Sequence, residues 1–202
     1  MSLARYLAHT RPTSAQIVLE PDEEVTALVR KIAPLARTSG VKVRPVDGLT
    51  GIADLADDYA DVIILDAFKA GSVPGDLVTE QFFADIARVL ASRGLLLINL
   101  VDERPFEWSR RAVAGLVARF ADVVLSAEAS TLKGRRAGNL VVAASVAPLP
   151  VAELDRLAAG AAFPYRVIAD TELITWLSGA RPFTTADTAD SPEIAQMMTW
   201  FR

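Results

Sequence analysis

The sequence predicts an α/β fold in which helices cover a doubly wound, mostly parallel sheet. Two observations carry this prediction. Strand-like and helix-like patterns alternate along most of the 202 residues, and residues 62–65 are four consecutive apolar β-formers, as in a strand covered on both faces. Two later strand patterns have no helical pattern between them, which predicts one antiparallel hairpin strand near a sheet edge.

The strands predicted in the first third of the chain are residues 16–19, 41–46 and 62–65. Short helices are expected at residues 3–7 and 51–56. Between the first two strands, Asp22 is a candidate N-cap for a helix with an apolar stripe that we expect to face the core. That stripe consists of Val25, Leu28, Val29 and Ile32.

The middle of the chain contains its strongest helical pattern, at residues 82–90, and Gly94 is expected to end that helix. The elements predicted after it are a strand at 95–100, a helix at 108–120, strands at 123–126 and 140–145, and helices that begin near Pro150 and Asp170. We therefore expect one domain over residues 1–180 and an irregular C-terminal tail over residues 181–202. The Trp200-Phe201 pair in that tail indicates a dimer or domain contact, so a homodimer is one expected assembly.

The composition argues against several classes of function. With 51% apolar and 23% charged residues the chain is expected to be globular, and its net charge of −4 argues against nucleic-acid and anionic-membrane partners. A single histidine and no cysteine argue against a metal site. No apolar run approaches the length of a membrane span, and the first residues lack a signal-peptide pattern. These features predict a soluble cytoplasmic protein that uses no metal.

Acidic residues follow three of the predicted strands: Glu20 (with Asp22), Asp47 and Asp66. Because ligands of open α/β sheets bind outside the carboxyl ends of the strands, these carboxylates are expected to line one rim. An ionised carboxylate accepts hydrogen bonds from ribose hydroxyls or an adenine amino group, and it can take a proton from a nucleophile. The alternative is that each one caps a helix or forms a turn, which is common for aspartate after a strand.

Five motifs occur in a characteristic order along the chain. They are L-E-P-D at residues 19–22, D-G at 47–48, Y-A-D-V-I-I-L-D at 59–66, V-P-G-D-L-V-T-E-Q-F-F at 73–83 and R-P-F-T-T-A-D at 181–187. Together they resemble the spermidine synthase family (aminopropyltransferases), a branch of the class I S-adenosylmethionine-dependent methyltransferase fold with a Rossmann-like sheet. The resemblance covers most of the chain.

The resemblance implies an activity and a role for each acid. Family members transfer an aminopropyl group from decarboxylated S-adenosylmethionine to the polyamine putrescine. Glu20, with Asp22 beside it, would match the acid that holds the ribose hydroxyls, and Asp47 of the Asp47-Gly48 pair would match the acid that reads the adenine amino group. Asp66 would match the acid that deprotonates the attacking amine, which must lose a proton before it can attack.

Two departures from the family pattern stand beside this resemblance. The position three residues after Asp66 is usually a second acid and is Lys69 here, and a cation there would repel putrescine. The family's first strand and glycine-rich loop are missing, which would leave a gap of roughly 9–10 Å between the strands at 16–19 and 62–65. We expect the natural chain to extend upstream of Met1, and an extended form to bind the nucleoside donor more tightly than this chain.

Two further functions remain open. The same sheet suits a small-molecule methyltransferase that uses S-adenosylmethionine, and the loss of the second loop acid favours that hypothesis. The chain also fits a non-catalytic nucleoside-binding or interaction protein, because fold alone does not determine activity.

Overall fold

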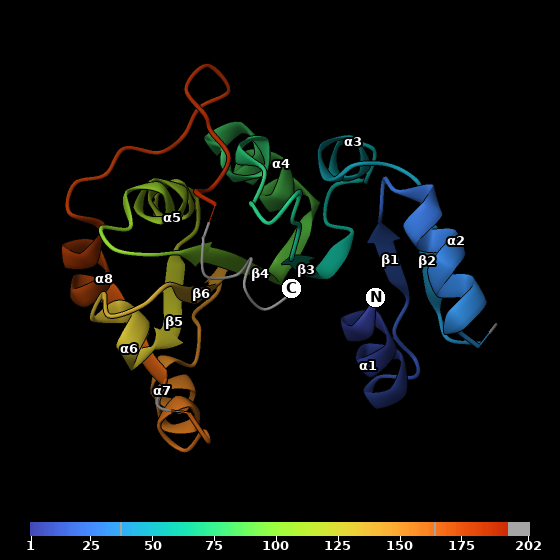
Figure 1. The fold of residues 1–202 in the computed structure, drawn as a ribbon, viewed down its shortest axis with the longest axis horizontal. Helices are drawn as coiled ribbons and strands as arrows, with labels where there is room; N and C mark the ends of the chain where they lie inside the picture. The colour runs from blue at the N-terminus through green and yellow to red at the C-terminus, as the bar shows by residue number, and fades with distance from the viewer. Residues whose placement is uncertain (37, 164, 194–202) are drawn as a thin grey trace. The chain divides into compact units, whose positions relative to one another are not determined.

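The structure, a computed structural model, describes residues 1–36, 38–163 and 165–193. The chain divides into two compact units, Met1–Leu55 (the N-terminal unit) and Ala56–Arg202 (the C-terminal unit) (Figure 1). The described strands form two sheets, with orders β1-β2 and β3-β4-β6-β5-β7. The α/β class is therefore confirmed, and the two strands predicted to flank a missing strand lie in different sheets. The predicted contact at Trp200-Phe201 lies outside the described residues.

The N-terminal unit is built around a parallel strand pair. Its elements are α1 (Ser2–Thr10), β1 (Gln16–Leu19), α2 (Glu23–Ile32), β2 (Val41–Arg44) and α3 (Gly48–Ala53). The register pairs Gln16 with Val41 and Leu19 with Arg44, so both strands end at the same edge. The helix α3 lies against β1 at Gly51, where a Cβ atom would come within 2.5 Å of Leu19 Cδ1. A glycine at this position therefore permits the close approach.

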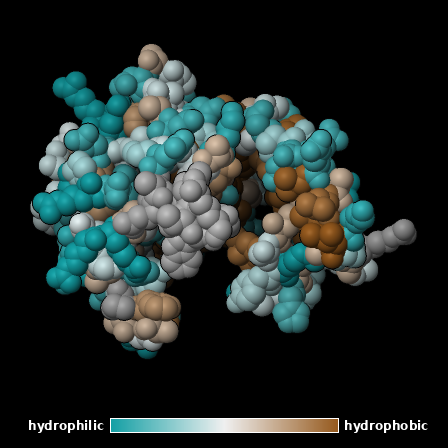
Figure 2. All heavy atoms as spheres, viewed as in Figure 1, coloured by the Kyte–Doolittle hydropathy of each residue, from teal (hydrophilic) through white to brown (hydrophobic). Residues whose placement is uncertain are grey.

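The apolar stripe of α2 does not face a core, so this part of the prediction is wrong. Val25, Leu28 and Ile32 are 43%, 55% and 69% exposed, and the buried residue of the helix is Thr26. A sheet of two strands offers a narrow face, and it leaves most of this apolar stripe uncovered. Figure 2 shows apolar residues gathered at the surface of this unit.

The C-terminal unit contains the larger sheet. Its elements are β3 (Ala60–Leu65), η1 (Gly75–Val78), α4 (Glu80–Val89), β4 (Leu90–Asp102), α5 (Glu107–Arg119), β5 (Asp122–Glu128), α6 (Ala129–Leu132), β6 (Gly138–Ser145), α7 (Val151–Ala159), β7 (Tyr165–Ile168) and α8 (Asp170–Leu177). The strand β3 is parallel to β4, β6 is antiparallel to both β4 and β5, and β7 is antiparallel to β5. The predicted hairpin of β5 and β6 is confirmed, with the short helix α6 in its connection. Its predicted place near a sheet edge is wrong, because β6 is the middle strand of the five, and β7 was not predicted.

The core of this unit lies between β4 and the helices α4 and α5. Phe83, Ile86 and Leu116 are fully buried there, together with alternate residues of β4. Thr79 caps α4 by accepting a 3.2 Å hydrogen bond from the backbone nitrogen of Phe82. The helix ends at Val89, and β4 begins at Leu90. Gly94, which was expected to end the helix, lies inside β4 instead.

Residues 181–191, which we call the C-terminal strap, are irregular but fixed by specific hydrogen bonds. The backbone nitrogen of Val73 donates to Ser191 Oγ (2.8 Å), and the backbone nitrogen of Ser191 donates to the Val73 carbonyl (2.9 Å). The backbone nitrogen of Gly75 donates to Asp190 Oδ1 (2.8 Å), and Trp108 Nε1 donates to the Ala189 carbonyl (2.7 Å). The strap therefore holds the loop that follows β3.

Arg111 on α5 anchors the other end of the strap. Its guanidinium donates to the carbonyls of Arg181 (3.0 Å) and Pro182 (3.2 Å) and lies 4.0 Å from the centre of the Phe183 ring. It also forms an ion pair with Asp187, and that hydrogen bond holds the pKa of the Asp187 carboxyl below its usual value. One cation thus contacts four residues of an otherwise irregular segment.

We predict that Gly75→Ala loosens the strap and destabilises the protein. The added Cβ atom would lie 2.2 Å from the Ala189 carbonyl oxygen and 2.4 Å from its carbon, so backbone would have to move. Overpacking of this kind costs about 1–3 kcal/mol of unfolding free energy, which urea denaturation measures.

Gly160→Ala is the matched control for this prediction. Gly160 has a φ of −85°, and the nearest atom to its added Cβ lies at 3.6 Å, an ordinary contact. Its unfolding free energy should stay within about 0.5 kcal/mol of the unmodified chain. Equal stability of the two variants would show that the strap does not depend on close contact at Gly75.

Candidate functional site

Asp66 comes directly after β3, at the carboxyl end of the strand, and its side chain is exposed. The parallel register pairs Leu65 with Ile98, which brings Asp66 alongside Asn99 of β4. Asn99 Nδ2 donates a 2.9 Å hydrogen bond to Asp66 Oδ1. The other carboxylate oxygen, Oδ2, has no hydrogen-bond partner among the described residues, so it is free to accept a proton or a hydrogen bond from a ligand.

Asn99 was not predicted from the sequence, although it is the one polar side chain in the run L-L-L-I-N-L-V at residues 95–101. Its Oδ1 atom is buried and finds no donor within the described part of the chain. An unsatisfied buried acceptor costs about 1–3 kcal/mol, so this residue is unfavourable for the strand by itself. The sequence signal that indicates Asn99 is a single polar residue within an apolar strand. It lies one position beyond Ile98, the register partner of Leu65.

The loop after Asp66 begins with a tight turn. Lys69 and Ser72 exchange two backbone hydrogen bonds of 2.8 and 3.0 Å, and the central residues Ala70 and Gly71 have φ values of +51° and +87°. Positive φ at both central positions defines a type I′ turn, which glycine tolerates and alanine adopts at a cost. Lys69 is exposed at the first position of this turn, three residues after the carboxylate.

Two predicted site residues of the N-terminal unit, Glu20 and Asp22, follow β1. Glu20 Oε1 accepts a 3.0 Å hydrogen bond from the backbone nitrogen of Asp22. Asp22 Oδ1 accepts from the backbone nitrogens of Glu24 (2.9 Å) and Val25 (3.0 Å), so it is the N-cap of α2, as predicted. Glu20 keeps its second oxygen without a partner in the described residues.

Asp47 follows β2 and is the N-cap of α3, the helix that begins at Gly48. Asp47 Oδ1 accepts from the backbone nitrogen of Thr50 (2.8 Å), and Oδ2 accepts from the Thr50 hydroxyl (3.0 Å). These hydrogen bonds from Thr50 hold the pKa of Asp47 below its usual value. Because β1 and β2 are parallel, Glu20 and Asp47 lie at the same end of their sheet, whereas Asp66 belongs to the C-terminal unit.

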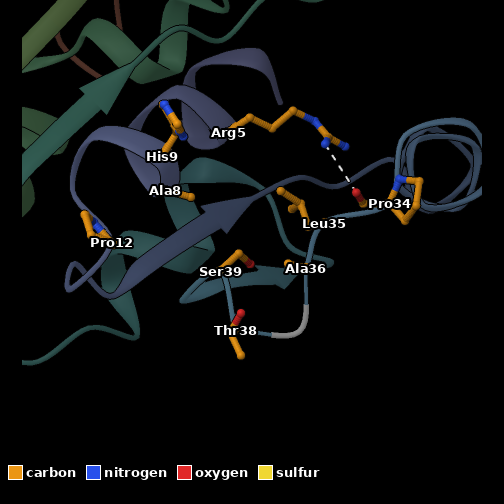
Figure 3. Close-up of a pocket in the computed structure, with 9 residues that line it drawn as sticks. All are labelled: Arg5, Ala8, His9, Pro12, Pro34, Leu35, Ala36, Thr38 and Ser39. Carbon is orange, nitrogen blue, oxygen red and sulfur yellow. Dashed lines mark hydrogen bonds between the residues drawn. The ribbon is translucent and has the colours of Figure 1, made fainter.

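Figure 3 shows a shallow pocket of the N-terminal unit. Its lining includes Arg5 and His9 of α1, together with the segment after α2. Arg5 Nη1 donates to the Pro34 carbonyl (3.4 Å), and no predicted site residue lines the pocket. In the described ranges, no group of three or more histidine or acidic side chains is arranged to hold a metal ion. No helix in those ranges is long and apolar enough to cross a membrane.

We predict that Asp47→Ala lowers the unfolding free energy by about 1 kcal/mol at neutral pH, because the helix cap is lost. Asp47→Asn keeps the helix cap and loses only the contribution of the charge. The folded-state pKa of Asp47 is depressed, so its charge-dependent contribution is present above the unfolded-state pKa and is lost as pH falls through the folded value. Chemical denaturation at pH 7 and pH 3 measures both variants. The difference in unfolding free energy between wild type and Asp47→Asn should therefore shrink from pH 7 to pH 3. A difference that grows over this range would contradict the prediction.

Three solved structures are similar to the chain. A probable spermidine synthase from Corynebacterium glutamicum ATCC 13032 matches with a TM-score of 0.83 and 28% identity, over 91% of this chain and 68% of that chain. Human methyltransferase-like protein 13, solved with SAH, matches with a TM-score of 0.61 and 21% identity, over 91% and 80%. A spermidine synthase in complex with the transition-state analogue AdoDATO matches with a TM-score of 0.58 and 21% identity, over 77% and 55%.

These matches differ in what they show. At 21% identity the second and third structures establish the fold alone, while the first is the more similar in both sequence and structure. No family model matches the chain, and no curated protein sequence does so either. The strand pairing, the order of the elements and these matches lead to one conclusion: the chain has a spermidine synthase-like fold of the class I methyltransferase type.

Proposed function

We propose that this chain transfers an aminopropyl group from decarboxylated S-adenosylmethionine to an amine acceptor such as putrescine, with Asp66 as the general base. The observation that carries the proposal is the exposed Asp66 carboxylate, which has one oxygen held by Asn99 and the other free at the carboxyl end of β3. Ligands of such sheets bind beyond this end of the strands. The similarity to a probable spermidine synthase and to a spermidine synthase bound to AdoDATO supports the same substrate class.

The chemistry follows from the charges. A primary amine is protonated near neutral pH and has no lone pair with which to attack. The Asp66 carboxylate takes one proton, and the neutral nitrogen then bonds to the propyl carbon attached to the sulfonium. The C–S bond breaks and its electron pair goes to sulfur. The products are a secondary ammonium group, neutral methylthioadenosine and protonated Asp66, which returns its proton to solvent.

Two acids of the N-terminal unit would hold the nucleoside half of the donor. Glu20, which has a free oxygen, would accept from the ribose hydroxyls, and Asp47 would accept from the adenine amino group through its remaining lone pairs. Asp22 and Gly48 would shape the backbone at these positions by starting α2 and α3. Since a sulfonium leaves as a neutral thioether, the reaction places its main demand on positioning.

Methyl transfer from S-adenosylmethionine is the second candidate, and one observation favours it. Lys69 places a positive charge on the loop three residues after Asp66. A diamine with two ammonium groups would meet that charge with its far end, whereas a neutral or anionic methyl acceptor would not. The neighbour solved with SAH, human methyltransferase-like protein 13, is consistent with this alternative.

We predict that Asp66→Asn reduces aminopropyl transfer by about 10²–10⁴-fold, because the amide cannot accept the proton. The unfolding midpoint should not change, since Asn can still accept from Asn99. Asp61→Asn is the matched control: Asp61 is exposed on the same strand, at its opposite end. Methylthioadenosine release is measured by chromatography with decarboxylated S-adenosylmethionine and putrescine. Equal rates for wild type and Asp66→Asn would refute the assigned base.

Product assays on the wild-type chain distinguish the three candidate functions. Methylthioadenosine release supports aminopropyl transfer, and S-adenosylhomocysteine formed from S-adenosylmethionine supports methyl transfer instead. Thermal stabilisation by methylthioadenosine with neither product supports a non-catalytic nucleoside-binding protein.

The charge of Lys69 also leads to a prediction about specificity for the amine acceptor. Lys69→Asp should lower the KM for putrescine about fivefold at low ionic strength, because a repulsion becomes an attraction for the second ammonium group. The effect should shrink as salt is added and should be small for propylamine, which lacks that second charge. Lys133→Asp, at an exposed position in the connection between β5 and β6, is the control. An equal change for the diamine and the monoamine would mean that Lys69 does not face the acceptor's far end.

A further inference from the structure

We propose that Asn99 is the positioning residue that sets the orientation of the Asp66 carboxylate for proton removal. This inference rests on the proposed function, because it assigns Asn99 a role through the general base. It starts from one contact, the 2.9 Å hydrogen bond from Asn99 Nδ2 to Asp66 Oδ1. The side chains belong to adjacent parallel strands and come together through the register of β3 and β4.

The chemistry of the pair fixes which atoms face each other. An ionised carboxylate can only accept hydrogen bonds, so the amide nitrogen of Asn99 must face it and the amide oxygen must point elsewhere. Held at Oδ1, the Asp66 carboxylate cannot rotate freely about its terminal bond. Its Oδ2 atom, which has no partner in the described residues, is then presented in one direction. A base held in one orientation loses less freedom when the amine arrives.

The position of Asn99 is itself rigid. The strand β4 pairs with β3 on one side and with β6 on the other, where Asn99 is the register partner of Val141. The residues on either side of it, Ile98 and Leu100, are 1% and 0% exposed and anchor the strand in the core. Asp66, by contrast, begins a loop. A donor on a central strand can therefore impose a fixed orientation on an acid at the edge of that loop.

The surroundings of Asn99 argue against a purely structural role. Its Oδ1 atom is buried without a donor in the described residues, and the strand around it is otherwise apolar. Leucine has the same branched shape and would leave no buried acceptor unsatisfied. A contribution to folding stability therefore does not explain the asparagine, whereas its hydrogen bond to Asp66 does.

Asn99→Leu tests the inference. In the purified full chain we expect kcat for aminopropyl transfer to fall about 10–100-fold. The KM for decarboxylated S-adenosylmethionine should stay within about twofold, and the thermal midpoint should be unchanged or higher. Asn139→Leu, the same change at an exposed position of β6, is the matched control and should keep wild-type kcat.

A double-variant cycle tests whether Asn99 acts through Asp66. Residues that act as one unit are not additive, so adding Asn99→Leu to Asp66→Asn should change the residual rate by less than about twofold. If the wild type is active and Asn99→Leu has the same kcat, the inference is wrong and the proposed function is unaffected. Additive losses in the double variant would also overturn it. A wild type without transfer to any amine would overturn the proposed function, and this inference with it.

Discussion

The parallel register between β3 and β4 is the constraint on which the candidate site depends. It places the carboxyl end of β3 beside a strand that is paired on both sides, and so brings Asp66 to Asn99. A shift of one residue would turn every side chain of β3 to the opposite face. Leu65, the buried residue of β3, opposes such a shift, because the shift would turn it away from the core. Hydrophobic packing thus fixes a polar contact at the edge of the sheet.

The loop beyond Asp66 is ordered by two separate means. A type I′ turn reverses the chain between Lys69 and Ser72, and the C-terminal strap then holds the residues that follow through Val73 and Gly75. The strap comes from a part of the sequence more than 100 residues away. Its anchor on Arg111 links the loop to α5, which packs in the core of the same unit. The loop beyond Asp66 is therefore ordered by one local turn together with tertiary contacts to the strap.

Sequence patterns predicted the α/β order and most elements because periodicity and turn residues are local signals. They failed for the apolar stripe of α2, because its exposure depends on how much of the helix the sheet covers. They also missed β7, a strand of four residues that includes an arginine at position 166. Asp66 and Asp47 follow strands, as the sequence predicted. The sequence also allows Asp47 to be a helix cap, which the structure confirms, whereas the contact of Asn99 depends on the register of β3 and β4.

The pH dependence of the Asp66→Asn variant tests the central claim most directly. If Asp66 removes the proton from the acceptor amine, a variant without this base must rely on amine that is already neutral. Its rate of methylthioadenosine release should then rise about tenfold per pH unit between pH 7 and 9, as the neutral fraction of an amine with a pKa near 10 grows. The gap to the wild-type rate should narrow over that range. A gap that stays constant with pH would contradict the assignment of Asp66 as the base.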